Sequence, residues 1–377
     1  MLSESFFIFL TILFIIYLQD FLRRERWLSL ILIALIAALA VMQRYMGSVL
    51  VATGFISIVL LPNKLTIYRR IRMSFCFIVI STTPVIIWLI RDFILTQTYF
   101  RPNFPSNYSL SQNAYFIIDL LTVWFIPRSV PFLMRAIILS SFTFIAVAIV
   151  FISLKSGIRD RKKLAATIPL GIFIIFYISV LLISATTFAF ERIDHRYLSP
   201  VYIFIIFFIL LALDDILALS NLFRAYKILI KFLVLVIFSL WLLYPFAYAV
   251  KMISHWMLIG AGEFNTITWR NSQVAYWVKA NPLPPVVYSN FPDALYFFTG
   301  LKAENSPKKF QFNSFKSKGD DLLQFKESLR LKEAYLVWFY NSGRDYLYNI
   351  NELSSVIGLR EIANLSDGAI YLLKSAD

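Results

Sequence analysis

The chain has 377 residues and a formal net charge of +14, with 59% hydrophobic and only 15% charged residues. This composition is more apolar than that of a soluble domain and predicts a polytopic protein of the lipid bilayer. The basic residues form short clusters between apolar runs, so we expect no nucleic-acid partner, and the single cysteine, Cys76, excludes an intramolecular disulfide.

Eight apolar segments follow one another through residues 1–251, and a bilayer core requires roughly 20 apolar residues per helix. They lie at about 5–18, 28–42, 46–61, 74–90, 130–154, 164–189, 201–217 and 228–250. We therefore expect a polytopic all-α membrane domain of about eight transmembrane helices. The first segment lacks a basic start and a small-residue cleavage site, so we expect it to be retained.

The second and third apolar segments are short and flank residues 43–47, which include Arg44. One long helix through both would place Arg44 near the bilayer centre, at a cost of about 3 kcal/mol or more. A tight turn at the membrane surface is therefore the better prediction.

Basic clusters predict how the chain is oriented. The clusters at 22–27, 64–72, 155–163 and 224–231 fall on one side of the membrane if every segment spans, and the positive-inside rule makes that side cytoplasmic. The Arg44 turn, the long loop 91–129, the segment 191–200 and all residues after 251 then lie outside. We expect a multi-pass protein of the inner (plasma) membrane, with Met1 outside.

Composition changes after about residue 252, where proline, asparagine, serine and lysine appear between short apolar runs. Apolar runs at 286–289, 334–340 and 369–373 predict strands, and amphipathic stretches at 269–280 and 320–332 predict helices. Alternating strands and helices indicate a small soluble α/β domain over residues 252–377, which the orientation places outside the membrane.

The segment 191–200 packs five ionisable residues between two long apolar runs. In one interpretation, Arg192, Asp194 and Arg196 pair with one another and with lipid headgroups, while Tyr197 joins the interfacial aromatic belt. In the other, Arg192, His195 or Arg196 binds an anionic headgroup and Asp194 orients it. Arginine suits that role because its planar fork donates two parallel hydrogen bonds to a phosphate.

The loop 92–129 contains an amphipathic run at 114–124. It predicts either an interfacial helix anchored by Tyr115 and Trp124, or a lid or acceptor-binding loop in which Arg101 is the residue of interest.

Several short motifs, taken in order, resemble the membrane glycosyltransferases of the GT-C superfamily, in particular the family 39-like enzymes that include protein mannosyltransferases and the aminoarabinose transferase. Asp194-His-Arg-Tyr-Leu-Ser-Pro200 before an apolar helix is similar to their Arg-Tyr-Leu-x-Pro signature. Ser3-Glu4 is similar to the Ser-Glu of a middle helix, and Arg44-Tyr-Met-Gly47 is similar to an Arg-Tyr-x-Gly turn. The stretch 84–91 resembles a Pro-x-x-x-Trp-x-x-Arg-Asn motif. Trp269-Arg-Asn-Ser and the stretch 288–293 resemble the start of an extracytoplasmic tail domain.

The resemblance implies an integral membrane glycosyltransferase that moves a sugar from a polyprenyl-phosphate donor to an acceptor on the extracytoplasmic face. The acceptor can be a glycan, a lipid or a protein. No cofactor is identified, and a divalent metal is left open. The expected substrate-binding residues are Arg192, Asp194, His195, Arg196 and Tyr197, followed by Arg101, Arg44, Arg91 and Glu4.

Family members carry, ahead of the Ser-Glu segment, an outer loop with the acidic residue thought to act as catalytic base or metal ligand. Nothing in this sequence matches that loop, so the catalytic residue is unassigned and we expect the enzyme to be incomplete at its N-terminus. The alternative is a non-catalytic membrane protein, either a transporter of lipid-linked glycans or a truncated paralogue that assists a complete enzyme. Charges at helix ends rather than near the midplane disfavour transport.

Overall fold

The computed structural model describes residues 2–61, 65–97, 105–155, 161–188, 191–220, 227–284, 286–310, 321–329, 333–340 and 343–374. It divides into two compact units, Met1–Pro245 and Phe246–Asp377. The division falls inside one helix, α9, whose residues extend from Lys227 to Ile259. Each unit is described by itself below.

Helices are the regular secondary structure of the first unit in its described residues. All eight apolar segments expected from the sequence are helices, and the amphipathic run at 114–124 forms a further one. The elements are α1 (Leu2–Arg24), α2 (Trp27–Gln43), the short 3-10 helix η1 (Tyr45–Gly47), α3 (Ser48–Leu60), α4 (Ile67–Thr96), α5 (Leu110–Val123), α6 (Phe132–Lys155), α7 (Arg161–Thr187), α8 (His195–Ser220) and α9 (Lys227–Ile259).

Within the described residues, five helices, α1, α4, α7, α8 and α9, are long and apolar enough to cross a membrane. The apolar helices α2 and α3 are shorter, at 17 and 13 residues. The structure therefore confirms a mostly helical chain with several membrane-length helices, whereas the number of eight spans and their orientation remain predictions.

Aromatic side chains fill the interior of this unit. Phe7, Phe14, Phe77, Phe173 and Phe204 come from α1, α4, α7 and α8 and are fully buried. The outward faces are apolar as well, and α9 in particular buries none of its most apolar stretch. Such faces are expected where lipid, rather than water, surrounds a helix.

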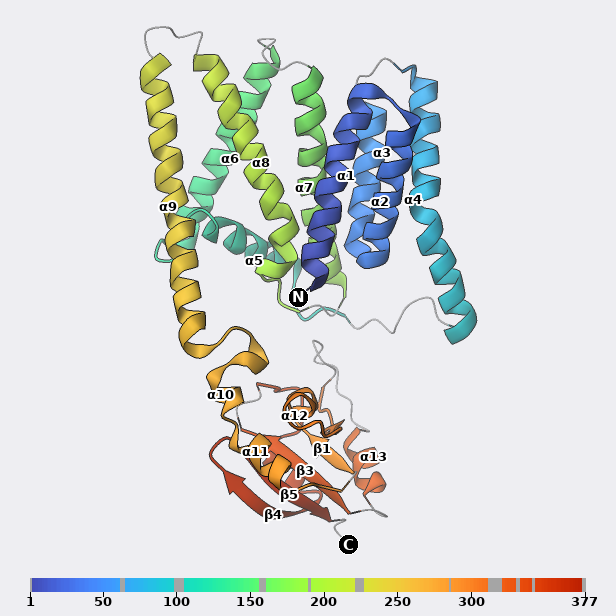
Figure 1. Ribbon diagram of the computed structural model, residues 1–377, viewed down its shortest axis with the longest axis vertical. Helices are drawn as coiled ribbons and strands as arrows, with labels where there is room; N and C mark the ends of the chain where they lie inside the picture. Colours follow the sequence, from blue (N-terminus) through green and yellow to red (C-terminus); the bar gives the residue numbers. More distant parts are fainter. Residues whose placement is uncertain are drawn as a thin grey trace. The chain divides into compact units, whose positions relative to one another are not determined.

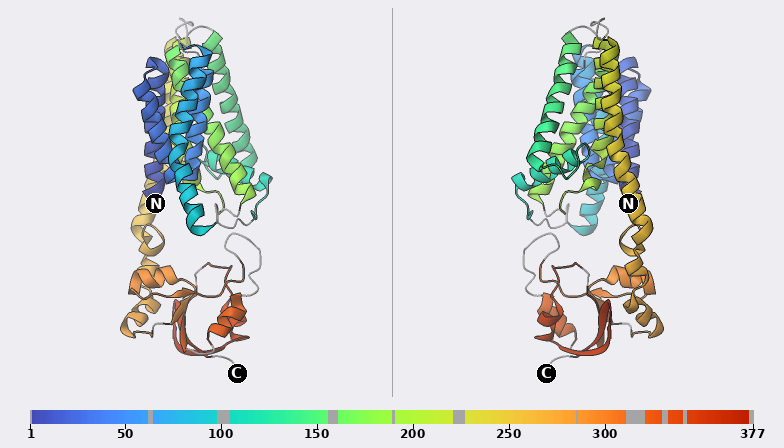
Figure 2. Two further views of the ribbon diagram at one scale, coloured as in Figure 1. Left: turned by 90° about the vertical axis from the view of Figure 1, so that its right-hand side faces the viewer. Right: turned by 90° about the vertical axis from the view of Figure 1, so that its left-hand side faces the viewer.

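Adjacent helices alternate in direction, so the short connections gather at two ends (Figures 1 and 2). The start of α1, the turn before η1, the helix α5 and the start of α8 lie at one end, which we call the polar end (Figure 1). The basic clusters 22–27 and 64–72 lie at the opposite end. The turn around Arg44 that the sequence predicts is present as an extended residue followed by η1.

The second unit contains a five-stranded sheet in the order β2-β1-β3-β5-β4. Strand β1 runs parallel to β2 and β3, and β5 runs antiparallel to β3 and β4. The strands are β1 (Val287–Ser289), β2 (Glu304–Asn305), β3 (Ala334–Phe339), β4 (Gly358–Leu365) and β5 (Gly368–Lys374), and the helical elements are η2 (Glu263–Asn265), α10 (Ile267–Arg270), α11 (Gln273–Ala280), α12 (Pro292–Thr299), α13 (Asp321–Ser328) and α14 (Ile350–Ser354).

Helices cover both faces of this sheet (Figure 2). Leu336 on β3 faces the cluster that contains Phe325 of α13, and its neighbour Val337 faces the cluster that contains Val274 of α11 and Leu295 of α12. Alternation along the strand thus supplies two apolar layers. The three strands predicted from apolar runs are present, which confirms a small C-terminal sheet.

Candidate functional site

The segment 191–197 forms a closed network of charges at the start of α8. The Asp194 carboxylate caps this helix by accepting a hydrogen bond from the Arg196 backbone N–H at 2.8 Å. The Arg196 guanidinium donates to Asp194 Oδ2 at 2.9 Å and to Glu191 Oε2 at 3.0 Å. The Tyr197 hydroxyl donates to the same Glu191 oxygen at 3.3 Å. Arg196 is therefore held between two carboxylates.

His195 connects α8 to α5. The indole Nε1–H of Trp124 donates to His195 Nδ1 at 3.0 Å, and the Trp124 ring packs edge-on against Tyr202 at a centroid distance of 4.7 Å. An indole N–H can only donate, so Nδ1 accepts and the neutral imidazole carries its proton on Nε2. This histidine therefore positions α5, and its Nε2 is the atom left to meet a ligand.

Arg192 is the expected site residue whose charge is most accessible to a ligand. Its guanidinium carbon lies 4.5 Å from the centre of the Phe116 ring, and its side chain is exposed. Among the described residues it makes no ion pair. Contact with an aromatic ring stabilises a cation without occupying its N–H groups in conventional hydrogen bonds.

A second exposed arginine lies against the same turn of α5. Arg128 Nη2 is 3.8 Å from Asp119 Oδ2, and Asp119 follows Phe116 by three residues on α5. Residues three apart share one face of a helix, so Arg192 and Arg128 approach α5 on neighbouring positions. Arg128 was not among the binding residues expected from the sequence.

A buried ion pair keeps α5 in position. Arg135 of α6 donates to Asp119 Oδ1 at 2.7 Å, to the Thr122 hydroxyl at 2.8 Å and to the Val130 carbonyl at 2.9 Å. The Arg135 side chain is 6% exposed and that of Asp119 is 17% exposed. The sequence carried a signal for this pair, because a charge within an apolar helix requires a partner.

The other end of α5 is held by α7. The Asn113 amide donates to the Ala185 carbonyl at 3.1 Å, and the Ser106 hydroxyl donates to the same carbonyl at 2.7 Å. A capping box formed by Ser109 and Gln112 starts the helix. The amphipathic helix expected from the sequence is thus present and is fixed by hydrogen bonds at both of its ends.

Glu4 and Arg44 form a second charge pair at the polar end. Arg44 Nη1 is 3.2 Å from Glu4 Oε1, and the two side chains are 20% and 22% exposed. The turn that carries Arg44 requires glycine three residues later, since a Cβ on Gly47 would lie 2.3 Å from the carbonyl carbon of Ala40. The glycine of the Arg-Tyr-Met-Gly motif is therefore a geometric requirement of this turn.

Tyr177 of α7 links the two charge networks. Its hydroxyl donates to the Tyr197 carbonyl at 2.8 Å, and its ring lies 6.5 Å from that of Phe7, one turn of α1 beyond Glu4. The structure therefore brings Glu4, Arg44 and the segment 191–197 to adjoining helices at one end of the bundle.

One of the expected site residues stands apart from these networks, and another cannot be placed. Arg91 is exposed near the end of α4, and α4 packs on α2 and α3. Arg101 lies outside the described residues.

No group of three or more histidine, cysteine, aspartate or glutamate side chains suited to a metal ion occurs within the described ranges. Glu191 and Asp194 are engaged by Arg196, and Asp119 by Arg135. The described residues thus favour binding of an anion over coordination of a cation.

Sequence reasoning also missed an ion cluster at the opposite end of the bundle. Lys163 Nζ at the start of α7 lies 2.7 Å from Asp214 Oδ2 and 3.2 Å from Asp215 Oδ1, both near the end of α8. Asp215 is completely buried. This cluster ties two helix ends together, away from the polar end.

Comparison of the chain with models of protein families, with curated proteins and with solved structures found no match. The function is therefore argued from the arrangement of charges at the polar end.

Proposed function

We propose that this chain is a multi-pass membrane protein that binds the phosphate of a polyprenyl-phosphate-linked sugar around α5 and the start of α8, and that it takes part in moving the sugar to an acceptor on the extracytoplasmic face. The observation that carries the proposal is the pair of exposed arginines, Arg192 and Arg128, over one turn of α5. Both remain accessible, whereas Arg135 and Arg196 are occupied by carboxylates.

Charge favours an anion at this turn. Three arginines, at positions 128, 135 and 192, contact α5, and Asp119 is the carboxylate that faces two of them. A phosphate bound by Arg192 and Arg128 would neutralise the excess positive charge and accept charge-assisted hydrogen bonds from both guanidinium groups.

The surroundings of α5 suit a lipid-linked anion better than a soluble one. The helix runs across the end of the bundle (Figure 1), and Leu110, Tyr115 and Ile118 on it are exposed. An amphipathic helix with exposed apolar side chains lies in the interface between headgroups and acyl chains. A polyprenyl chain could therefore remain in the bilayer while its phosphate reaches the arginines.

Sugar transfer requires stabilisation of the leaving phosphate and a carboxylate that deprotonates the acceptor hydroxyl. Arg192 and Arg128 suit the first task. Among the described residues, four carboxylates of α1, α5 and the segment 191–194 each face an arginine: Glu4 faces Arg44, Asp119 faces Arg135, and Glu191 and Asp194 share Arg196. A further carboxylate, Asp92, follows Arg91 near the end of α4. The base is therefore left unassigned.

The occupied carboxylates favour one alternative, a membrane protein that binds a lipid-linked glycan without transferring its sugar. Such a protein would transport the glycan or assist a separate enzyme. It needs the phosphate site at α5 but no free carboxylate, so phosphate binding supports both functions and only transfer distinguishes them.

Binding of polyprenyl phosphate to the full chain in lipid nanodiscs tests the proposal. We expect Arg192→Gln and Arg128→Gln each to weaken binding about tenfold, since a hydrogen bond to a charged group is worth about 1.5–3 kcal/mol. Arg23→Gln is the matched control, because Arg23 is exposed at the opposite end of α1. Wild-type affinity in the Arg192→Gln Arg128→Gln double variant would refute the site.

A transfer assay with a radiolabelled polyprenyl-phosphate sugar then separates the two functions. Product that depends on Arg192 supports the transferase. Tight binding without product, in the same membranes, supports the non-catalytic alternative.

A further inference from the structure

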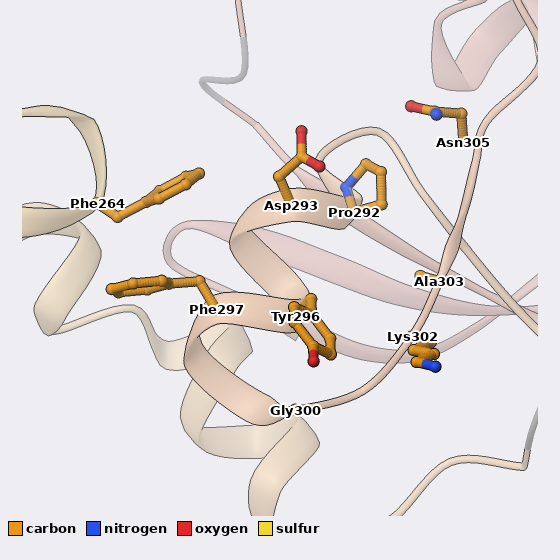
Figure 3. A pocket seen from close by; sticks show the side chains of 9 residues that line it. All are labelled: Phe264, Pro292, Asp293, Tyr296, Phe297, Gly300, Lys302, Ala303 and Asn305. Carbon is orange, nitrogen blue, oxygen red and sulfur yellow. The ribbon is translucent and has the colours of Figure 1, made fainter. Parts of the chain in front are cut away.

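The C-terminal unit has a shallow, open hollow of about 750 Å³ beside α12. Figure 3 shows Tyr296 and Phe297 projecting from α12, with Phe264 beside Phe297 and with Lys302 and Asn305 on the chain segment that follows the helix. Its lining is almost equally polar and apolar, which distinguishes it from an apolar docking groove.

Aromatic rings form one side of the hollow. Phe264 and Phe297 stack at a centroid distance of 5.3 Å and an interplanar angle of 26°. Phe264 also contacts Trp269 edge-on at 6.0 Å, and Trp269 packs on Phe291 at 5.2 Å. Phe297 and Tyr296 are nonetheless mostly exposed. Phe264 and Phe297 are thus supported by neighbouring aromatic rings, while Tyr296 and Phe297 keep exposed faces that could meet a ligand.

Polar groups of three kinds surround these rings. Asp293 presents a carboxylate that is exposed and lies 3.2 Å from Arg344 Nη2. Lys302 presents an exposed ammonium group, and Asn305, on the edge strand β2, presents an exposed amide. The hollow therefore offers acceptors and donors on the same rim.

A pyranose sugar complements both features. One of its faces is lined by C–H groups, which pack on the electron-rich face of an aromatic ring, and its edge carries hydroxyl groups that donate and accept hydrogen bonds. An anionic membrane surface would be attracted by Lys302 but repelled by Asp293. A purely apolar peptide would cover Lys302 and Asn305 without giving them polar partners.

We propose that this hollow binds a neutral oligosaccharide, with Tyr296 and Phe297 stacking on sugar rings and with Asp293, Lys302 and Asn305 contacting their hydroxyl groups. The inference concerns the C-terminal unit alone and does not require that the membrane unit transfer sugar. If transfer occurs, the bound oligosaccharide is its acceptor.

Saturation-transfer NMR on the full chain in nanodiscs tests this site with three probes, the hexasaccharides of β-1,4-linked N-acetylglucosamine, α-1,6-linked mannose and α-1,4-linked glucose. We expect at least one to bind, Tyr296→Ala to weaken it about tenfold, and Tyr296→Phe to retain it. Asn305→Ala should weaken it less. Tyr276→Ala is the matched control, because Tyr276 is an exposed tyrosine on α11 outside the hollow. Unchanged thermal unfolding of each variant excludes loss of the fold.

Absence of binding for all three hexasaccharides, or equal binding by wild type and Tyr296→Ala, overturns the proposal. Quenching by brominated lipids of a fluorophore attached at Tyr296→Cys, in a Cys76→Ala background, overturns it too and assigns the rings to the membrane surface. The Arg192→Gln Arg128→Gln variant should keep oligosaccharide binding, and Tyr296→Ala should keep polyprenyl-phosphate binding. Failure of one proposal is thereby distinguishable from failure of the other.

Discussion

Two of the charge networks at the polar end are both built from arginine–carboxylate ion pairs, but they differ greatly in burial. In the pair between Asp119 and Arg135 both side chains are largely buried, whereas Arg196 is 56% exposed between Glu191 and Asp194. Removing one partner of a buried pair leaves an unpaired charge away from water, but an exposed charge regains water. The first network therefore fixes the structure, whereas the second contributes little to stability.

The largest effect is expected when the buried pair is broken. Arg135→Leu leaves Asp119 without its main partner, and we expect the free energy of unfolding to fall by about 3–5 kcal/mol. Unfolding by dodecyl sulfate in mixed micelles, followed by circular dichroism, measures this loss.

Replacing both residues of the buried ion pair supplies the control for that prediction. Arg135→Leu combined with Asp119→Leu should recover much of the stability, because no buried charge is then left alone. Arg128→Leu should cost less than about 1 kcal/mol, since Arg128 is exposed and 3.8 Å from Asp119. A loss as large for Arg128→Leu as for Arg135→Leu would contradict the role given to burial.

The pair between Glu4 and Arg44 lies between these two extremes of exposure. We expect Arg44→Gln to lower the free energy of unfolding by roughly 1–2 kcal/mol, because glutamine keeps a donor but not the charge. The same unfolding experiment measures it, with Arg23→Gln as the control. If Arg44→Gln lowered the free energy of unfolding less than Arg196→Gln does, side-chain exposure would not explain how much each ion pair stabilises the fold.

Breaking the exposed network should hardly change stability. We expect Arg196→Gln to cost less than about 1 kcal/mol in unfolding. Its effect on polyprenyl-phosphate binding should also be smaller than that of Arg192→Gln, because Arg196 already faces two carboxylates. Equal loss of binding in both variants would move the phosphate site toward the start of α8.

The smallest effect concerns an ion pair in the C-terminal unit. A hydrogen bond from Lys309, together with the Asn349 backbone N–H, lowers the pKa of Glu352 below its ordinary value of 4.5. The lowered pKa means that the pair stabilises the fold above about pH 4.5 and that this stabilisation is lost as pH falls through the folded-state pKa. Lys309→Met should flatten the pH dependence of unfolding in that acidic window, whereas Lys302→Met should leave it unchanged.

Much of the helical unit could be predicted because long apolar runs admit few alternatives in a bilayer. The segment expected at 28–42 is α2, Trp27–Gln43, and the one expected at 164–189 is α7, Arg161–Thr187. The strand β4 was missed, since Arg360 and Glu361 interrupt its pattern and it pairs on one side only. The eight-residue helix α12 was missed as well.

The candidate site was less predictable than the helices. The segment 191–197 was identified from its charges between two apolar runs, whereas Glu4 and Arg44 were expected in the site only because they resemble motifs of the glycosyltransferases. The structure brings all of them to one end. The contacts of Arg192 with Phe116 and of Trp124 with His195 join residues more than 70 positions apart, and no local pattern indicates such pairs.

The sequence by itself determined that the chain has several helices long and apolar enough to cross a membrane, where these helices lie, and that a C-terminal sheet is present, because hydropathy and periodicity act over short stretches of chain. Only the tertiary structure decided which charges are occupied and which remain open. Whether an arginine meets a carboxylate, an aromatic ring or solvent depends on helices that come together in space, and burial at that meeting point sets the energy of the contact.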